Sequence, residues 1–409
     1  MLTDIVVQNV ASFRIDPAVL ARPHRRTVLV TSPTQHQKLL KRNRADVFDR
    51  VIVHEDFSPS GIARCVTAVR DALPPGDRDG VRLLCHDEYA LGAVAEARLL
   101  AGVPGDRPEQ VAPFVDKLAM KAALADAGVR LPKHREWSAA DYHRDPGRYA
   151  AGLGDDLGWP VFVKPLDESG SVGTAVLRDA AALHAWAREA GERRFELDEY
   201  LDGDLFHVDT TVRDGEILHA KANRYLHPCY DYLKGRLCAS WTLPDDRPEA
   251  EALKEFNRRV LEAFRDKPRD GVFHHEVFRR PDGELVFLEI ASRAPAALVP
   301  STHRIAWGVD IEESHFRLQR GERPLAPEAT GLHAAWAYFP KRAGTVVDLR
   351  TARLRSDHHW QWNVETGRTT EAPRDIRDFS AAVLLWNSDH DALLEDLRTL
   401  DAHRAVLTA

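Results

Sequence analysis

The chain has 409 residues, of which 44% are hydrophobic and 29% charged, and this composition is typical of a globular protein of two or three domains. A formal net charge of -7 without a Lys/Arg-rich tract argues against a nucleic-acid partner. No apolar run approaches the ~20 residues that cross a bilayer, and no amino-terminal segment resembles a signal peptide, so we expect no membrane partner. The four cysteines lie far apart without a CxxC pair, which favours reduced thiols and a cytoplasmic location.

Strand-like and helix-like segments alternate through residues 1–115. This order predicts an α/β domain with a parallel, doubly wound sheet, whose ligand lies beyond the carboxyl ends of the strands. His86, Asp87 and Glu88 follow a predicted strand, although Asp87 and Glu88 are equally a helix N-cap and a first-turn acid. The GxGxxG fingerprint is absent, so we do not expect a dinucleotide. The predicted strands cover residues 27–31, 50–54 and 81–85, and the predicted helices residues 35–46, 62–73 and 90–101.

A helix is predicted from residue 116 to about residue 126, just before Gly128, and its first turns are rich in lysine. Lys117 and Lys121 lie in its first turns, where the helix macrodipole favours anions. Lys117 is therefore a candidate ligand of a bound anion, and a solvated lysine is the alternative.

A glycine-rich loop follows a predicted strand that ends at Lys164. The loop contains Gly170, Ser171 and Gly173 and leads into a second strand. Glycine lets the backbone approach phosphates closely, and the lysine adds a point charge. No helix follows the loop, so it is not a GxxxxGK[ST] loop. A phosphate-binding loop and a plain hairpin turn both fit this pattern.

Residues 195–212 are predicted to form two strands joined by an Asp-Gly turn. Asp198, Glu199 and Asp204 are suited to accept hydrogen bonds from an amino group and a ribose, or are exposed turn residues. The aromatic-rich segment 225–244 is predicted to be irregular, as a pocket wall or as packed core.

Residues 271–295 are predicted to form a β-hairpin with an Arg-Pro-Asp-Gly turn. Side chains alternate between faces, so His274 shares a face with Glu276, and Glu289 shares a face with Arg293. Two converging carboxylates repel each other unless a cation lies between them, and Mg2+ prefers such oxygen ligands. Two solvated acids are the alternative.

The carboxyl-terminal part is predicted to contain strands at residues 334–339 and 380–386 and a final amphipathic helix at 391–400. His358 and His359 are expected in an exposed loop rather than in a metal site.

Three of these stretches, in this order along the chain, resemble the ATP-grasp superfamily: the glycine loop that follows Lys164, the acid-rich strands at residues 195–212 and the hairpin at residues 271–295. The resemblance covers residues 81–321 and is nearest to the carboxylate–amine ligases that include bacterial L-amino acid ligases. It implies an ATP-grasp fold with four units: a Rossmann-like domain (1–115), a mobile glycine-loop lid (116–195), an antiparallel-sheet core that binds ATP and Mg2+ (196–330) and a closing subdomain (331–409). The matching segments are DKLAMKAALADAGVRLP, WPVFVKPLDESGSVGTAVL, DEYLDGDLFHVD, GVFHHEVF and ELVFLEIASR.

The resemblance implies ATP and Mg2+, with Mn2+ as an alternative metal, and an amide bond formed from a small carboxylate and an amine through an acyl phosphate. It also suggests a homodimer. It assigns Lys117 and Lys164 to the ATP phosphates and Gly170, Ser171 and Gly173 to the lid. It also assigns Asp198 and the backbone of Glu199 to Leu201 to the adenine, and Asp204 or His207 to the ribose. It assigns Glu276 and Glu289 to the metal, Arg293 to the acyl phosphate and His274 to the substrate carboxylate.

Two departures from the family pattern leave the substrates open. Ala291 stands where many members have Asn, and Ala294-Pro295-Ala296-Ala297 replaces a loop that is often Gly-Gly. An ATP-grasp carboxylase or formyltransferase acting on a purine-type precursor, and an ATP-binding regulator without turnover, are the alternative functions.

Overall fold

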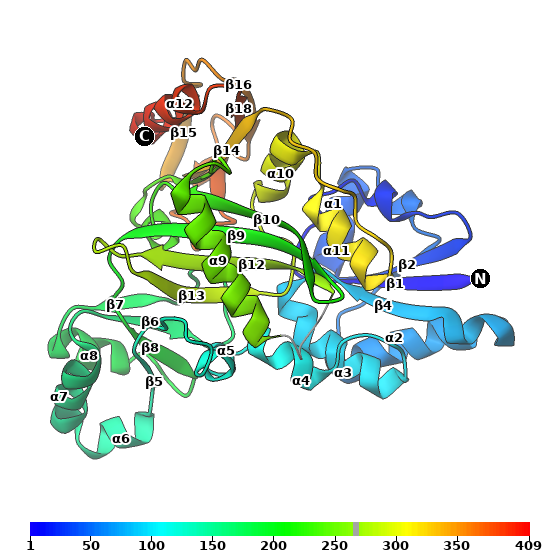
Figure 1. Cartoon of the computed structure of the whole chain (residues 1–409), viewed down its shortest axis with the longest axis horizontal. Coiled ribbons are helices and arrows are strands. Elements are labelled where there is room, and N and C mark those ends of the chain that lie inside the picture. The colour runs from blue at the N-terminus through cyan, green and yellow to red at the C-terminus, as the bar shows by residue number, and fades with distance from the viewer. Residues whose placement is uncertain (265–269) are drawn as a thin grey trace.

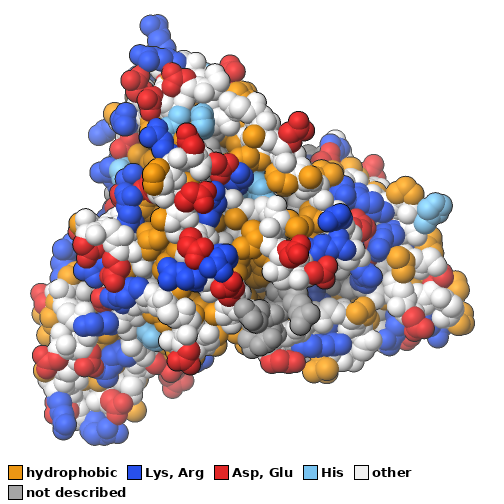
Figure 2. Space-filling view, viewed as in Figure 1, with side chains coloured by type: hydrophobic (Ala, Val, Ile, Leu, Met, Phe, Trp, Pro, Cys, Tyr) orange, Lys and Arg blue, Asp and Glu red, His pale blue; other side chains and the backbone are white. Residues whose placement is uncertain are grey.

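The computed structural model describes residues 1–264 and 270–409, and these residues form four β-sheets (Figure 1). In Figure 1 the amino-terminal domain lies at the right, a long antiparallel sheet crosses the centre, and a small helix-covered sheet lies at the lower left. Acidic and basic side chains are interspersed over the face in Figure 2, so this face carries no extended field of one sign. Within the described ranges, no helix is both long and apolar enough to span a bilayer.

The amino-terminal sheet is parallel, with strand order β3-β2-β1-β4, which confirms the predicted doubly wound domain. Its central strand β1 (Leu2–Gln8) was not predicted, because its apolar run is only three residues long between the buried polar residues Asp4 and Gln8. The other strands are β2 (Arg25–Thr31), β3 (Arg50–Val53) and β4 (Val81–Cys85), and the helices are α1 (Pro33–Lys41), α2 (Pro59–Asp71), α3 (Leu91–Ala101) and the one-turn α4 (Pro108–Val111).

Helices cover both faces of this sheet. The apolar sides of α2 and α3 pack on one face, and Leu39 of α1 contributes to the core on the other face, together with Phe316 of α11 (Ile311–Gln319). Since α11 lies in sequence between two strands of the central sheet, this second core ties the amino-terminal domain to the rest of the chain.

The small sheet has the order β5-β8-β6-β7 and is antiparallel. A Trp- and Tyr-rich core lies beneath helices that cover one face. Helix α5 (Lys117–Leu124) precedes the sheet and is capped by the Asp116 carboxylate. The sheet contains β5 (His134–Glu136), β6 (Val161–Pro165), β7 (Ala175–Leu177) and β8 (Phe195–Glu199), and its helices are α6 (Ala139–Arg144), α7 (Pro146–Leu157) and α8 (Ala180–Ala187).

The central sheet has eight strands in the order β13-β12-β9-β10-β11-β14-β18-β16. Helix α9 lies across β9, β10 and β12 (Figure 1) and buries Leu253, Phe256 and Val260 in the largest apolar core. The opposite face carries a second core that includes Val299 of α10. The strands are β9 (Asp204–Arg213), β10 (Glu216–Tyr225), β11 (Cys238–Thr242), β12 (Gly271–Arg279), β13 (Leu285–Ala291), β14 (His333–Pro340), β16 (Asp357–Trp362) and β18 (Phe379–Asn387), and the helices are α9 (Pro248–Ala263) and α10 (Val299–Trp307).

The last part of the chain completes the fold with a small three-stranded sheet and the predicted final helix. Helix α12 runs from His390 to Ala402 and packs Leu393, Leu397 and Leu400 on the main core. The small sheet contains β15 (Gly344–Leu349), β17 (Thr369–Thr370) and β19 (Val406–Thr408).

Two sequence predictions were wrong. Residues 238–242 form the buried strand β11 rather than irregular chain, because they pair with both β10 and β14 in the middle of the sheet. His358 and His359 lie in strand β16 rather than in a loop, and they are exposed because β16 is the edge of the sheet.

Candidate functional site

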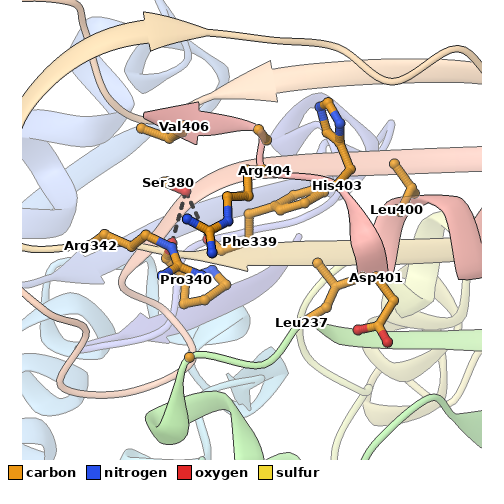
Figure 3. A pocket seen from close by; sticks show the side chains of 12 residues that line it. Leu237, Phe339, Pro340, Arg342, Ser380, Leu400, Asp401, His403, Arg404 and Val406 are labelled. Atoms are coloured by element: carbon orange, nitrogen blue, oxygen red, sulfur yellow. Dashed lines mark hydrogen bonds between the residues drawn. The ribbon is translucent and has the colours of Figure 1, made fainter. Parts of the chain in front are cut away.

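A cavity of about 720 Å³ lies where the amino-terminal domain, the small sheet and the central sheet meet. Most of the predicted site residues line it: Lys117, Lys164, Gly170, Ser171, Asp198, Glu199, Leu201, His274, Glu276, Glu289 and Arg293. A second cavity, of about 50 Å³, lies beside α12 and β19 (Figure 3), and none of the predicted site residues lines it.

The two hairpin glutamates are direct cross-strand partners. Glu276 on β12 pairs with Glu289 on β13, and a bulge follows Glu276. The Glu276 carboxylate accepts a hydrogen bond of 2.9 Å from the Tyr225 hydroxyl. Burial and the nearby Glu276 charge raise the pKa of Glu289, although Lys117 lies 3.9 Å from its carboxylate. The two adjacent carboxylates offer oxygen ligands that fit a hard divalent cation.

Two lysines, Lys117 and Lys164, line the same cavity as the glutamates. The Lys164 ammonium lies 2.8 Å from the Asp198 carboxylate, and Lys117 donates a 2.6 Å hydrogen bond to the backbone oxygen of Glu168 at the glycine loop. Asp198 is buried and also binds Lys121, so its carboxylate fixes the two lysines. Burial and the neighbouring lysines lower the pKa of Lys121 to about 8, although Asp198 opposes this shift.

The glycine loop has three residues with left-handed backbone, Gly170, Ser171 and Gly173, with φ of 64°, 64° and 68°. The Ser169 hydroxyl bonds to the Tyr89 hydroxyl of the amino-terminal domain at 3.0 Å. The loop therefore lies across the cavity and contacts the opposite wall.

The catalytic-arginine candidate Arg293 is bound by Glu88. One Glu88 oxygen accepts hydrogen bonds from Nε and Nη2 of Arg293, at 3.0 and 2.8 Å. Burial disfavours both charges, but each group stabilises the other, so the pKa of Glu88 is lowered and the pKa of Arg293 is raised. Asp87 is the N-cap of the following turn, as predicted.

His274 is held by a carboxylate that the sequence analysis missed. Its Nδ1 lies 2.6 Å from Asp209, which also binds His207 and His303, at 2.9 and 3.0 Å, and Asn223. Burial opposes a charged imidazole, but Asp209 outweighs it and raises the pKa of His274 to about 9. The His-x-Asp spacing of His207 and Asp209 on β9 could have predicted this contact, since side chains two residues apart on a strand lie on the same face.

His207, Asp209 and His274 offer ligand atoms within 4.8 Å of one another. Their ring nitrogens already bond to the carboxylate, and His207 also bonds Ser240. We therefore interpret the group as a buried hydrogen-bond network beneath Glu276.

Three predicted site residues do not line the cavity. The Asp204 carboxylate points to Arg224 and Arg279, with oxygen–nitrogen distances of 2.6 and 2.8 Å. Side chains alternate between the two faces of β9, and the Asp204 side chain lies on the face that is turned away from the cavity. His207 is fully buried in the Asp209 network, and Gly173 lies behind the loop against Pro165. The ribose assignment of Asp204 and His207 is therefore not supported by their positions.

The hinge between β8 and β9 and the aromatic segment supply the remaining wall. Glu199, Tyr200 and Leu201 line the cavity, but the Glu199 carboxylate bonds to Arg130 and to the backbone of Lys133. Its backbone is thus the part of Glu199 that is available to a ligand. Tyr230 also lines the cavity and packs edge-on against Phe162.

No family model matches the chain. An L-arginine-specific L-amino acid ligase of Bacillus subtilis is 29% identical over 260 residues, which are 61% of this chain and 60% of that ligase. The chain therefore spans less than two thirds of the length of this relative.

Two solved structures are similar over nearly the whole chain. An L-amino acid ligase from Bacillus licheniformis has a TM-score of 0.75 at 14% identity and covers 100% of this chain and 99% of its own. The biotin carboxylase domain dimer of a Hydrogenobacter thermophilus 2-oxoglutarate carboxylase, in complex with MgADP, ADP and bicarbonate, has a TM-score of 0.68 at 15% identity and covers 98% and 90%. The chain therefore has the ATP-grasp fold, and its sequence resembles that of the bacterial L-amino acid ligases.

Proposed function

We propose that the chain is an ATP-dependent carboxylate–amine ligase that joins a small carboxylate to an amine through an acyl phosphate. The observation that carries the proposal is the Glu276–Glu289 pair, which shares one cavity with Lys117, Lys164 and Arg293. Phosphoryl transfer needs positioned cations and metal-binding carboxylates, and this wall supplies both.

In this proposal Glu276 and Glu289 hold Mg2+, or Mn2+ in its place. Bound with ATP, the metal neutralises triphosphate charge while the nucleotide supplies the phosphoryl group that activates the carboxylate. Lys117 and Lys164 bind phosphate oxygens, and Asp198 keeps Lys164 extended toward them. Ala291 is buried and pairs with His274, so any metal depends on the two glutamates without a third hairpin ligand.

Arg293 and His274 act on the carboxylate side of the cavity. Arg293 stabilises negative charge on the acyl phosphate, and Glu88 fixes its orientation. His274 carries a positive charge at neutral pH, because its pKa is raised to about 9, and it orients the substrate carboxylate. The loop at Gly170–Gly173 closes over the phosphates and excludes water from the reactive acyl phosphate.

The proposal divides the chain into the amino-terminal domain (1–115), the lid (116–195), the catalytic core (196–330) and the closing subdomain (331–409). A homodimer is part of the proposal, supported by the dimer of the carboxylase domain. Sedimentation of the purified protein tests this state.

A carboxylase is the second candidate function. The similarity to a carboxylase domain with bound bicarbonate supports it, as does Ala291 in place of the Asn that many ligases have. Bicarbonate-dependent ADP formation without an amine distinguishes a carboxylase from a ligase.

The test is phosphate release from ATP and Mg2+ across a matrix of amino acids, small carboxylates and bicarbonate. Glu276→Gln and Arg293→Gln proteins serve as site variants, and Glu216→Gln, an exposed glutamate outside the cavity, is the matched control. A substrate pair that raises release in the parent and control, but not in the site variants, establishes the ligase. Mg2+-dependent ATP binding with a flat matrix favours a regulator, and no ATP binding contradicts the proposal.

A further inference from the structure

Four basic side chains line one end of the main cavity: Arg14, Lys38, Arg42 and Arg377. They come from the loop after β1, from α1 and its end, and from the segment before β18. All four are exposed at the cavity wall, and none belongs to the proposed ATP or metal site.

Three of these cations lack an acidic partner. Among the described residues, no carboxylate lies within 4.0 Å of the charged groups of Arg14, Lys38 or Arg42, whereas Arg377 binds Asp375 at 2.9 Å. Lys38 donates to the Ser12 hydroxyl at 3.3 Å, and Arg42 to the Phe13 backbone oxygen at 3.4 Å. These contacts orient the side chains without neutralising them.

Lys38 is close enough to Arg42 and Arg377 to be repelled by their charges. The pKa of Lys38 is lowered by partial burial and by the charges of Arg42 and Arg377. Like charges held together in this way favour an anion that binds between them.

The loop that carries Ser12, Phe13 and Arg14 is fixed in place. One Asp87 oxygen accepts hydrogen bonds from three consecutive backbone N–H groups at residues 9–11, and Glu312 accepts from the backbone of Arg14 and Ile15 at 2.9 and 3.0 Å. The Phe13 ring stacks on His86, with ring centroids 4.6 Å apart. The loop is therefore organised before any ligand binds, which lowers the entropic cost of binding.

Acids on this side of the cavity are already engaged. The Asp87 carboxylate binds backbone N–H groups, Glu88 binds Arg293, and Asp375 binds Arg377. They leave the charges of Arg14, Lys38 and Arg42 free for a ligand.

We propose that Arg14, Lys38, Arg42 and Arg377 form a subsite for a substrate that carries an anionic group, a phosphate or a carboxylate, apart from its reacting group. The proposal deepens the ligase function and rests on it. Three unpartnered cations exceed the single charge of an α-carboxylate, whereas a phosphate monoester carries about -1.5 to -2 charges at pH 7, and a side-chain carboxylate adds a second charge to an amino acid. Phosphate and carboxylate groups share this chemistry, because arginine and lysine recognise both.

The experiment measures equilibrium binding to the full chain by calorimetry, with Mg2+ and a non-hydrolysable ATP analogue, so that its readout does not depend on turnover. The probes are two matched pairs: O-phospho-L-serine with L-serine, and L-glutamate with L-glutamine. We expect at least one anionic probe to bind about tenfold or more tightly than its neutral partner, since hydrogen bonds between charged groups are stronger than those between neutral groups. The preferred pair distinguishes a phosphate from a carboxylate.

Arg14→Gln and Lys38→Gln should each reduce that preference by about tenfold. Lys41→Gln is the matched control, because Lys41 lies on the same helix and is exposed but does not line the cavity. Equal binding within both probe pairs, or an equal loss in Lys41→Gln, overturns the subsite. If no substrate raises phosphate release but the anionic probes still bind more tightly than the neutral ones, the ligase function is rejected and the subsite is kept. If neutral substrates are turned over and the probes bind equally, the ligase function is kept and the subsite is rejected.

Discussion

Arg293 donates two hydrogen bonds to a single oxygen of Glu88, at 3.0 and 2.8 Å, across a sequence separation of 205 residues. Glu88 follows the last strand of the amino-terminal sheet, and Arg293 follows the second strand of the β12–β13 hairpin. This contact joins the two domains at the cavity and fixes the orientation of the arginine that we assign to the acyl phosphate.

Glu88→Gln removes the negative partner of Arg293 and leaves that guanidinium in a largely buried wall. We expect the free energy of unfolding to fall by about 1.5–3 kcal/mol, since this is the range for hydrogen bonds to charged groups. Urea unfolding measures the change. The control Glu251→Gln removes an exposed partner of Lys254 and should change stability by less than about 0.5 kcal/mol; equal losses in the two variants would show that the Arg293 contact has no special role.

Glu289→Gln should separate stability from activity. Burial and Glu276 raise the pKa of Glu289, so its ionised form destabilises the metal-free protein at neutral pH. The carboxylate is partly exposed, so solvent screening limits the gain on removing the charge to under about 1 kcal/mol. Thermal unfolding without metal should show a higher melting temperature, while Mg2+-dependent ATP binding is lost. A lower melting temperature contradicts the prediction, and Glu216→Gln should change neither quantity.

Asp209→Asn leaves three buried histidines without their shared carboxylate. Because breaking a buried ion pair exposes an uncompensated charge, we expect a loss of about 3–5 kcal/mol in the free energy of unfolding. The pKa of His274 should also fall below 9, which NMR titration of its ring protons measures. Asp214→Asn, at an exposed turn, is the matched control and should lie within about 0.5 kcal/mol of the parent. An unchanged His274 pKa would contradict the role of Asp209.

The pH dependence of stability should carry the signature of His274. Its folded pKa of about 9 exceeds the ordinary value of 6.5, so its stabilisation is complete below pH 6.5 and is lost as the pH rises through 9. Lys121 acts in the opposite sense, since its pKa is lowered from 10.5 to about 8 and its contribution rises with pH in that window. The stability difference between the parent and His274→Gln isolates the histidine. Chemical unfolding at pH 6, 8 and 10 should show that difference shrinking, and a constant difference would contradict the assignment.

Gly170→Ala tests the conformation of the loop. Gly170 has a φ of 64°, which costs an L-residue about 1–2 kcal/mol, and its added Cβ would lie 3.4 Å from Ile376. We expect ATP affinity to fall by about 5- to 30-fold, as measured by calorimetry. Gly152→Ala in helix α7 has open space around the new methyl group and should leave ATP affinity unchanged. An unchanged affinity in Gly170→Ala would show that the loop does not close over ATP.

The sequence by itself determined the local elements and the order of the site motifs. The turn chemistry and period-two pattern of residues 271–295 correctly predicted the hairpin, and the observed register pairs Glu276 with Glu289. The alternating segments correctly predicted the parallel sheet, because hydrophobic periodicity is a local property. Strand β1 was not predicted because buried polar residues interrupt its apolar run, and the Asp4 carboxylate pairs with Arg25 and Arg320, which lie 21 and 316 residues away.

Only the tertiary structure decided which charged groups meet. Lys121 joins Lys164 on Asp198, Asp209 gathers three histidines, and Glu88 reaches Arg293. Asp204, placed near the ribose from its motif, instead pairs with two arginines. Such contacts depend on how separate domains pack, and no local pattern encodes a distance between residues far apart in the sequence. The physical reason is that burial, which sets the protonation and orientation of these groups, exists only once the domains have closed around the cavity.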